Sequence, residues 1–578
     1  MLACSAMVAC TNDDVLENNE SPLVNKGNSY LSVNLSMGNP VSRAAETQGE
    51  EFDNGTDAEA AVKDNNVIFL FYDASGNYVT DGTIQYYSDG NTTPAAGNDL
   101  EWNVNDDGTN IERNASPVIV LGPTKVAPAK VIAILNNNAL AYTCKEKELS
   151  ATQDLVRNTT NYRTDAGFVM SNSTYVKDNK VVYAADIAPE QICESAADAI
   201  ANPVDIYVER VAAKITWKFA DTVEGQKEEN MFLMHSGTAT GDYMVNGNLT
   251  QLRVEIVGVK ANAYNETSSL VKKINTGSYF TGWNDAGNFR SYWAEDKNYN
   301  GVVEANLTEP WEYTGDSFTG LKYLTFVGNE NKDQNYGDDA ALTFYVNENT
   351  MTEPKVAAND KTNATTILVL GRIYVGKDAS TANTTLFTYK GGYYTEQNYL
   401  NIVASNLTGF ASDENGTPLT AADFIWKDTN DKYSYNKVNY QTVVLKPVAI
   451  AEGKTIYKKT TTTVEDEVVT TWAEATLADV QNACTLDTKL YLNGMCYYQI
   501  PIKHIYNDDT DADALGEYGI VRNHSYQLTL TKLTNIGGAV IDEKEELDHI
   551  PGKDKDYYIA ATLNVLAWRV VDNQNVEL

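Results

Sequence analysis

The chain has little of what catalysis, metal binding and nucleic-acid binding need. It contains only 4 His in 578 residues, and the patterns H-E-x-x-H, G-x-S-x-G, G-x-G-x-x-G and G-x-x-x-x-G-K-[ST] are all absent. The common zinc-protease, serine-hydrolase, dinucleotide and phosphate-loop sites are therefore missing. Basic residues are also scarce, 44 against 79 acidic ones, which gives a net charge of −35. This charge argues against nucleic acid and anionic lipid as partners. We expect neither enzymatic activity nor a cofactor.

Cysteine is also scarce, with six in the chain and no C-x-x-C pair. A zinc ribbon or a thioredoxin-type site is therefore not expected. Cys144 and Cys193 form one separated pair, and Cys484 and Cys496 form another. In an exported protein, disulfides within each pair would cross the chain least. Free buried thiols are an equal alternative, so the disulfide state stays open.

Tyrosine is abundant, with 36 Tyr against 14 Phe and 8 Trp. Tyr, Thr and Val favour pleated strands, and here they alternate with the turn-forming residues Asn, Asp and Gly. Hydrophobic residues make up 43% and charged residues 21%, which is typical of folded proteins. At ~100–200 residues per domain, the length suggests two to four domains. The composition predicts an all-β, extracytoplasmic protein with a few short helices.

The first residues of the chain resemble part of an export signal rather than a fold. Residues 1–9 are uncharged and apolar, too short for a membrane span, and they precede Cys10. Residues 7–10 resemble a lipobox, in which Cys10 is acylated, and the following Thr-Asn-Asp-Asp resembles the export tag of Bacteroidetes lipoproteins. Cys4 is a second, weaker candidate. The alternative is an apolar start with a core Cys.

Residues 30–37 have the alternation of a half-buried strand. Leu31, Val33, Leu35 and Met37 lie on one face, with polar residues between them. An acidic linker that contains Arg43 follows, and this is the only Arg in residues 1–112. A strand joined to the body by an exposed linker is a separable element. The alternative is an ordinary first strand that never leaves.

The last part of the chain repeats this pattern. A polar stretch at 542–555 precedes a strand at 558–568, whose alternate apolar residues share one face: Ile559, Ala561, Leu563, Val565 and Ala567. The chain is therefore predicted to carry a detachable amphipathic strand at each end.

Between the two ends, strand patterns alternate with turns. We predict a long strand at 204–217, with Glu209 and Arg210 near its middle, and an exposed hairpin at 459–472. A weak helix is predicted at 477–483, and the polar stretch 221–249 suggests a domain boundary. The predicted division is a signal and linker at 1–10 and 11–49, two sandwich domains at 50–222 and 223–541, and a terminal segment at 542–578.

Five local features together resemble the fimbrillins of Bacteroidetes, the type V pilin family, and in particular the shaft subunits of short fimbriae. They are the lipobox at Cys10, the strand and Arg segment 30–45, the segments 208–214 and 518–526, and the terminal segment 565–568. The segments 289–294 and 345–350 are also similar to the family.

The resemblance implies two transthyretin-like β-sandwich domains, export as an outer-membrane lipoprotein, and a final location in cell-surface fimbriae. It also implies that an Arg-specific surface protease cuts between Arg43 and Ala44 and removes the first strand. The C-terminal strand of a neighbouring subunit then fills the groove, so the implied partners are further copies, the anchor and tip subunits, the protease, and host or bacterial surface ligands.

Other interpretations remain beside the shaft subunit. Residues 509–513 alternate Asp like a calcium loop, but Ala514 and Ile520 stand where an EF-hand needs Gly and Glu, so no metal is expected. A tip or accessory adhesin would carry a glycan- or protein-binding surface, built for example from the many aromatic side chains. A glycan-binding lipoprotein or hydrolase would need a carboxylate pair that a single sequence does not reveal.

Overall fold

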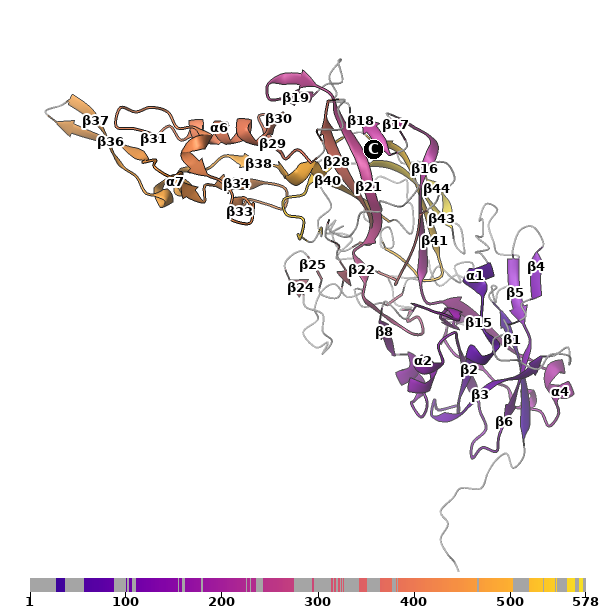
Figure 1. Ribbon diagram of the computed structural model, residues 1–578. Coiled ribbons are helices and arrows are strands. Elements are labelled where there is room, and N and C mark those ends of the chain that lie inside the picture. The colour runs from indigo at the N-terminus through magenta and orange to yellow at the C-terminus, as the bar shows by residue number, and fades with distance from the viewer. Residues whose placement is uncertain are drawn as a thin grey trace, which may run out of the picture.

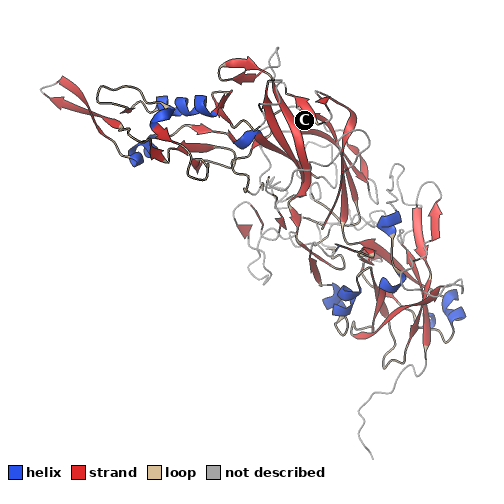
Figure 2. Cartoon of the chain, viewed as in Figure 1, coloured by secondary structure: helices blue, strands red, loops and turns tan. Residues whose placement is uncertain are grey.

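The computed structural model describes most of the chain, and strands dominate it (Figure 2). The described residues are 28–36, 57–87, 100, 103–106, 111–153, 155–158, 162–177, 180–224, 226–228, 230–234, 243–274, 294–295, 313–314, 317–318, 321–322, 324, 326, 342–350, 364–376, 381, 383–464, 467–502, 519–533, 535–545, 547, 559–566 and 571–574. The predicted all-β class is confirmed, because sheets form every core and the described helices are short.

The N-terminal lobe is a sheet that closes on itself. Around the ring run, in order, β1 (Ser29–Ser36), β6 (Pro117–Leu121), β3 (Tyr78–Tyr87), β2 (Val67–Tyr72), β7 (Lys130–Leu135), β11 (Met170–Asn172) and β15 (Val204–Arg210). β15 then pairs in parallel with β1 and completes the ring. β4 (Asn103–Asp106) and β5 (Ile111–Ala115) extend it from β1, and β14 (Ala185–Asp186) extends it from β7.

Both faces of this sheet are buried at β2, which explains its uninterrupted apolar sequence. Val67, Phe69 and Phe71 point into the core of the ring. The alternate residues Ile68, Leu70 and Tyr72 contribute to a second cluster on the outer face. That cluster includes residues of α2 (Asn138–Thr143) and α3 (Leu149–Gln153). The other α-helices described in this lobe are α1 (Asp57–Ala60) and α4 (Ala196–Ala201).

The C-terminal sandwich consists of two sheets that face each other across the largest apolar cluster. One sheet has the order β27 (Leu342–Val346), β16 (Ala213–Glu224), β41 (Ser525–Leu533), β43 (Ile559–Leu566) and β44 (Val571–Gln574). The other has the order β17 (Gln226–Glu228), β18 (Met231–Leu233), β21 (Leu252–Asn262), β28 (Thr366–Val375), β40 (Met495–Pro501) and β42 (Gly538–Ala539). Trp217 and Tyr526 from the first sheet meet Val254 and Tyr498 from the second in this core.

A projecting lobe, residues 383–491, is inserted between β28 and β40, although these two strands pair directly with each other (Figure 1). Its base is a sheet of β20 (Asn248–Thr250), β19 (Tyr243–Val245), β30 (Gly392–Thr395), β29 (Leu386–Tyr389) and β39 (Leu490–Tyr491). The lobe has its own core, to which α6 (Glu396–Asn406) contributes Tyr399, Leu400 and Val403.

The remaining elements of the projecting lobe are short, and they end in a hairpin at its tip (Figure 1). They are β31 (Phe410–Ala411), β32 (Phe424–Ile425), β33 (Ser434–Lys437), β34 (Val443–Lys446), β35 (Ala449–Ile450), β36 (Tyr457–Val464), β37 (Glu467–Glu474), α7 (Leu477–Ala483) and β38 (Asp487–Thr488). β36 and β37 form the predicted hairpin at 459–472, and α7 is the predicted helix.

One predicted strand is wrong. Residues 204–217 form two strands in different sheets, β15 in the N-terminal lobe and β16 in the C-terminal sandwich. The chain changes sheets at Val211 and Ala212, directly after Glu209 and Arg210, whose backbones still pair with β11 while their side chains reach Lys272 and the Glu59 carbonyl at the junction. The predicted domain boundary stays a prediction; β16 runs across position 222.

The four Cys that the structure describes are free thiols. Cys144, Cys484 and Cys496 are buried, and Cys193 is half-buried. Neither of the disulfides considered from the sequence is formed. Among the described residues, no helix is long and apolar enough to span a membrane.

Candidate functional site

The predicted removable strand, β1, lies in the middle of the N-terminal lobe. Its first half pairs antiparallel with β6, where Leu31 is opposite Ile119. Its second half pairs in parallel with β15, where Leu35 is opposite Ile206, and residues 35–36 also pair with β5. Tyr30 exchanges two backbone hydrogen bonds with Cys193, of 2.8 and 2.9 Å. β1 is therefore paired along both edges.

The apolar face of the predicted alternation agrees with the burial of β1, although Ser32 on the other face is also buried. Leu31, Val33 and Leu35 have no exposed surface and belong to the core of the ring. On the other face, Asn34 Nδ2 donates to Asp205 Oδ1 at 3.1 Å. At ~1.5–3 kcal/mol for each buried side chain, these three contribute roughly 5–9 kcal/mol of apolar burial.

β1 is the strand that closes the ring, and this position decides what its removal would do. Because β1 pairs with β6 on one side and β15 on the other, its loss would leave an apolar groove between two strand edges. Such a groove can accept an extended segment that offers the same alternation of side chains.

Several predicted site residues lie outside the described residues. They are Cys10, Met37, Arg43 and Ala44. The calcium-like loop at 509–513 also lies outside them. Within the described part of the chain, no group of three or more His, Cys, Asp or Glu side chains could hold a metal ion.

The predicted donor strand is β43, which in this monomer pairs with the chain's own β41. Eight residue pairs join the two strands, from Ser525 opposite Leu566 to Leu533 opposite Ile559, with a register shift between Leu530 and Lys532. β44 covers part of the other edge of β43. Ile559, Ala561, Leu563 and Val565 occupy alternate positions of this strand, as predicted.

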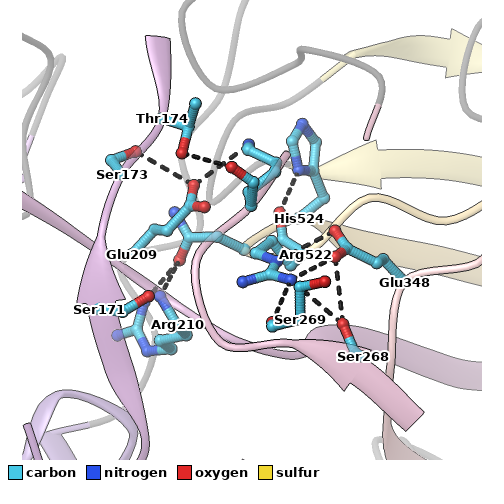
Figure 3. A network of polar contacts seen from close by, with 12 residues as sticks. Ser171, Ser173, Thr174, Glu209, Arg210, Ser268, Ser269, Glu348, Arg522 and His524 are labelled. Atoms are coloured by element: carbon cyan, nitrogen blue, oxygen red, sulfur yellow. Dashed lines mark hydrogen bonds and ion pairs between the residues drawn. The ribbon is translucent and has the colours of Figure 1, made fainter. Parts of the chain in front are cut away.

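Between the two strands lies a junction cluster, which we define as Glu59, Glu209, Arg210, Lys214, Lys272, Glu348, Arg522 and Asn523. Figure 3 shows four of these residues, Glu209, Arg210, Glu348 and Arg522. The three family-like segments 208–214, 345–350 and 518–526 meet here. Sequence reasoning noted each segment but did not place them together. The two charges predicted in the middle of a strand, Glu209 and Arg210, were the signal that could have revealed the cluster.

The first part of the junction cluster joins β15 to residues 267–272, a segment that follows β21 of the C-terminal sandwich and that we call the strap. Lys272 Nζ lies 3.2 Å from Glu209 Oε2, and neither side chain has exposed surface. Ser173 Oγ donates to Glu209 Oε2 at 3.1 Å, and Thr174 Oγ1 donates to the Lys272 carbonyl at 2.6 Å. A short ladder between β8 (Val156–Asn158) and β23 (Thr267–Ser269) reinforces this strap.

The second part of the cluster is centred on Arg522, whose side chain is fully buried. Its Nε donates to Glu348 Oε2 at 3.0 Å, and its Nη2 forms a second bond to the other oxygen of the same carboxylate. Nη1 donates to the Leu270 carbonyl at 2.9 Å and Nη2 to the Ser269 carbonyl at 2.7 Å (Figure 3). Bidentate Arg–carboxylate pairing fixes geometry as well as charge.

The third part of the cluster anchors α1, the first described element after β1. Lys214 Nζ lies 3.0 Å from Glu59 Oε1, and Tyr345 OH donates to the same oxygen at 2.5 Å. Arg210 Nε donates to the Glu59 carbonyl at 2.7 Å. Burial and the neighbouring Glu59 carboxylate raise the pKa of Tyr345, so this phenol stays protonated and keeps donating.

Arg210 also reaches the turn that precedes β41. Its backbone N–H and its Nη1 both donate to Asn523 Oδ1, each at 3.4 Å. Asn523 N donates to the Ala212 carbonyl and Lys214 N donates to the His524 carbonyl, both at 2.8 Å. The His524 ring donates from Nδ1 to the Arg522 carbonyl at 2.8 Å. The end of β15 and the start of β41 are thus held together by direct bonds.

Comparison with known proteins finds a family that the C-terminal part of the chain resembles. Residues 489–574 match the family described as major fimbrial subunit protein type IV, fimbrillin, C-terminal. This match contains β40, β41 and β43, and it confirms the resemblance to fimbrillins. No curated protein is similar enough to count as a match.

Two solved structures are similar to the chain at low identity. One is a fimbrilin from Porphyromonas gingivalis W83, at 16% identity and a TM-score of 0.36, covering 94% of this chain and 98% of that chain. The other is the tip fimbrial protein Mfa3 from the same species with a C-terminal truncation, at 11% identity and a TM-score of 0.30, covering 94% and 100%. TM-scores in this range do not establish a shared fold.

Proposed function

We propose that this chain, whose residues 489–574 match the fimbrillin C-terminal family, is a structural shaft subunit of a cell-surface fimbria that supports adhesion and biofilm formation. In this proposal it is exported as a lipoprotein acylated on Cys10. An Arg-specific protease then cuts between Arg43 and Ala44, and the β43 segment of a neighbouring copy replaces β1. The single observation that carries the proposal is the ring-closing position of β1.

Strand exchange is consistent with the physical chemistry of β1. The two strands have the same length, eight residues each. Both have apolar residues at alternate positions, so a donor strand can recover the burial that the ring core loses with β1. Each new ladder hydrogen bond adds ~0.5–1.5 kcal/mol.

The arrangement of the two strands supports an open polymer. β1 belongs to the N-terminal lobe and β43 to the C-terminal sandwich, so the groove and the donor strand are different surfaces of one subunit (Figure 1). A contact between different surfaces is head-to-tail, and without closure it extends into a filament. A subunit that retains β1 would be capped against assembly.

The test is an Arg43→Ala variant of the full chain, treated with an Arg-specific protease. We expect the variant to stay monomeric, while the wild type forms SDS-resistant ladders and filaments in negative-stain micrographs. Arg163→Ala is the matched control, because Arg163 is an exposed Arg on β9 (Arg163–Thr164) of the same lobe. Filaments from Arg43→Ala would refute the proposed processing site, and loss of filaments in Arg163→Ala would show that the effect is not specific to Arg43.

A tip or accessory adhesin is the second candidate, and the projecting lobe favours it. The lobe has its own core, and its hairpin exposes most of its described side chains, including Lys458, Lys459 and Thr460–463. Removal of residues 559–578 separates the two roles. A shaft subunit without this segment would still accept a donor strand but would end the filament, whereas a tip subunit would function unchanged.

A further inference from the structure

Each of the two predicted exchange strands is flanked by a strand that runs into the junction cluster. β15 pairs with β1 along Val204–Tyr207 and reaches the cluster two residues later, at Glu209. β41 begins at Ser525, directly after Arg522 and Asn523, and pairs with β43 along its whole length. The cluster is therefore the place where the neighbours of both strands meet.

We propose that the junction cluster couples the two strands, so that β1 in its place stabilises β43 in its place, and the reverse. The proposal rests on the proposed function only for the role of the two strands in assembly. The coupling itself is a property of the monomer, and it would regulate when the donor strand becomes available.

The first half of the coupling follows from the two ladders of β15. β1 holds the half of β15 that lies away from the cluster, and β11 pairs with Val208–Arg210. Without β1, the half around Val204–Tyr207 loses a paired edge and can fray toward Glu209. The Glu209–Lys272 pair has no exposed surface, so any fraying that reaches Glu209 disturbs a buried charge.

The second half follows from the bonds between β15 and the turn before β41. Arg210 donates twice to Asn523, and residues Ala212 and Lys214 bond to the backbone of the same turn. Disorder at the end of β15 therefore removes the bonds that hold the start of β41. Ser525, the first residue of β41, is opposite Leu566 of β43, so the loss reaches the last residue of that strand.

In this proposal the buried cluster is the two-state element: it is formed while β1 is in place and opens when β1 is lost. Coupling between two sites requires such an element, whose equilibrium both sites bias. Coupling is reciprocal, and it typically changes an equilibrium by about 5–150-fold. A subunit that keeps β1 would keep its donor strand docked, and removal of β1 would release it.

The test is amide hydrogen exchange of the full-length monomer without protease. Leu35→Ala weakens β1 opposite β15, and Asn523→Gly removes the acceptor of Arg210. Glycine suits this position, because the φ of Asn523 is 59°. We expect each variant to raise the exchange rate in both 29–36 and 559–566, by at least about 5-fold.

Two matched controls share the chemistry of these changes but lie away from the cluster. Leu400→Ala truncates a buried Leu in the core of the projecting lobe, and Asn383→Gly changes an exposed Asn with a φ of 65°. Both should leave exchange in 559–566 unchanged. Glu209→Gln is a second cluster variant, used if Asn523→Gly does not fold.

Two results would overturn the coupling. One is faster exchange in 29–36 of Leu35→Ala with wild-type exchange in 559–566. The other is an unprotected β43 in the wild-type monomer, because a strand that is not held cannot be released. Neither result depends on polymerisation, so failure of the Arg43→Ala test would count against the proposed function and leave the coupling standing.

Discussion

The Arg522–Glu348 pair allows a sharp test of what the buried charges at the junction contribute. Both side chains are almost fully buried, at 0% and 2% exposure, and 174 residues separate them in sequence. Glu348→Gln removes the negative charge and leaves Arg522 charged in the protein interior. Arg522→Met/Glu348→Leu removes both charges and keeps a similar volume of apolar atoms.

The two changes should have very different effects on the free energy of unfolding. Removing one partner of a buried pair costs about 3–5 kcal/mol, because an uncompensated charge remains. Replacing both partners by apolar residues is often neutral or stabilising. Here, however, the double variant also leaves the Ser269 and Leu270 carbonyls without the Arg522 donors, at ~1–3 kcal/mol for each unsatisfied group. Each of the single variants Arg522→Met and Glu348→Leu breaks the same pair and leaves one buried charge, whereas the double variant breaks the pair once and leaves neither. We therefore expect the double variant to cost less than the sum of these two single variants.

Urea unfolding of the full chain, followed by tryptophan fluorescence, measures these differences. The control is Asp186→Asn, which breaks the exposed Lys130–Asp186 pair of 2.6 Å and should cost less than about 1 kcal/mol. If Glu348→Gln cost no more than this control, the buried pair would not stabilise the junction. If the double variant cost the full sum of the single variants, the two side chains would act independently, and the reasoning would be wrong.

Two further predictions concern the thiols and a helix cap. Native protein should react with a thiol reagent at Cys193 before Cys144, Cys484 and Cys496, because the latter three are buried. Burial also raises the pKa of Cys496 to about 12. Mass spectrometry after alkylation identifies the labelled residues, and early labelling of Cys496 would contradict its burial. The Thr476 hydroxyl and backbone lower the pKa of Asp479 from 3.8 to about 2, so the carboxylate stabilises α7 above pH 3.8 and this stabilisation is lost as the pH falls toward 2. Amide exchange in residues 477–483 should therefore gain protection between pH 2 and 4 once corrected for the intrinsic rate, and Asp479→Asn should abolish that change.

Local patterns predicted much of the fold, because they depend on neighbours in sequence. The alternation at 30–37 predicted that Leu31, Val33 and Leu35 are in the core, which the structure confirms, but it did not predict the burial of Ser32. The Thr-rich segment around 459–472 predicted the β36–β37 hairpin, whose strands need only a short turn between them. The helix at 477–483 was also predicted, and Thr476 and Asp479 form its capping box.

The junction cluster was not predictable in this way, because its contacts join distant segments. Glu59 meets Lys214 and Tyr345, and Arg210 meets Asn523 across 313 residues. No periodicity encodes which buried charge pairs with which. The same holds for the projecting lobe, since the direct pairing of β28 with β40 becomes visible only in three dimensions.

The distribution of Arg adds an argument for a selective protease step. The chain has ten Arg, of which Arg43, Arg290 and Arg569 lie outside the described residues. The described ones other than Arg522 lie in strands: Arg113, Arg157, Arg163, Arg210, Arg253 and Arg372. Arg522 is fully buried, and the projecting lobe contains no Arg, although it carries Lys458 and Lys459 on exposed positions.

Paired strands resist proteolysis, because cleavage requires a segment that can leave its ladder. An Arg-specific protease could therefore cut the linker at Arg43 while the described sheets and the projecting lobe stay intact, whereas a Lys-specific protease should nick the lobe. The order of cleavage by the two kinds of protease, followed on a gel, distinguishes this selectivity from general exposure.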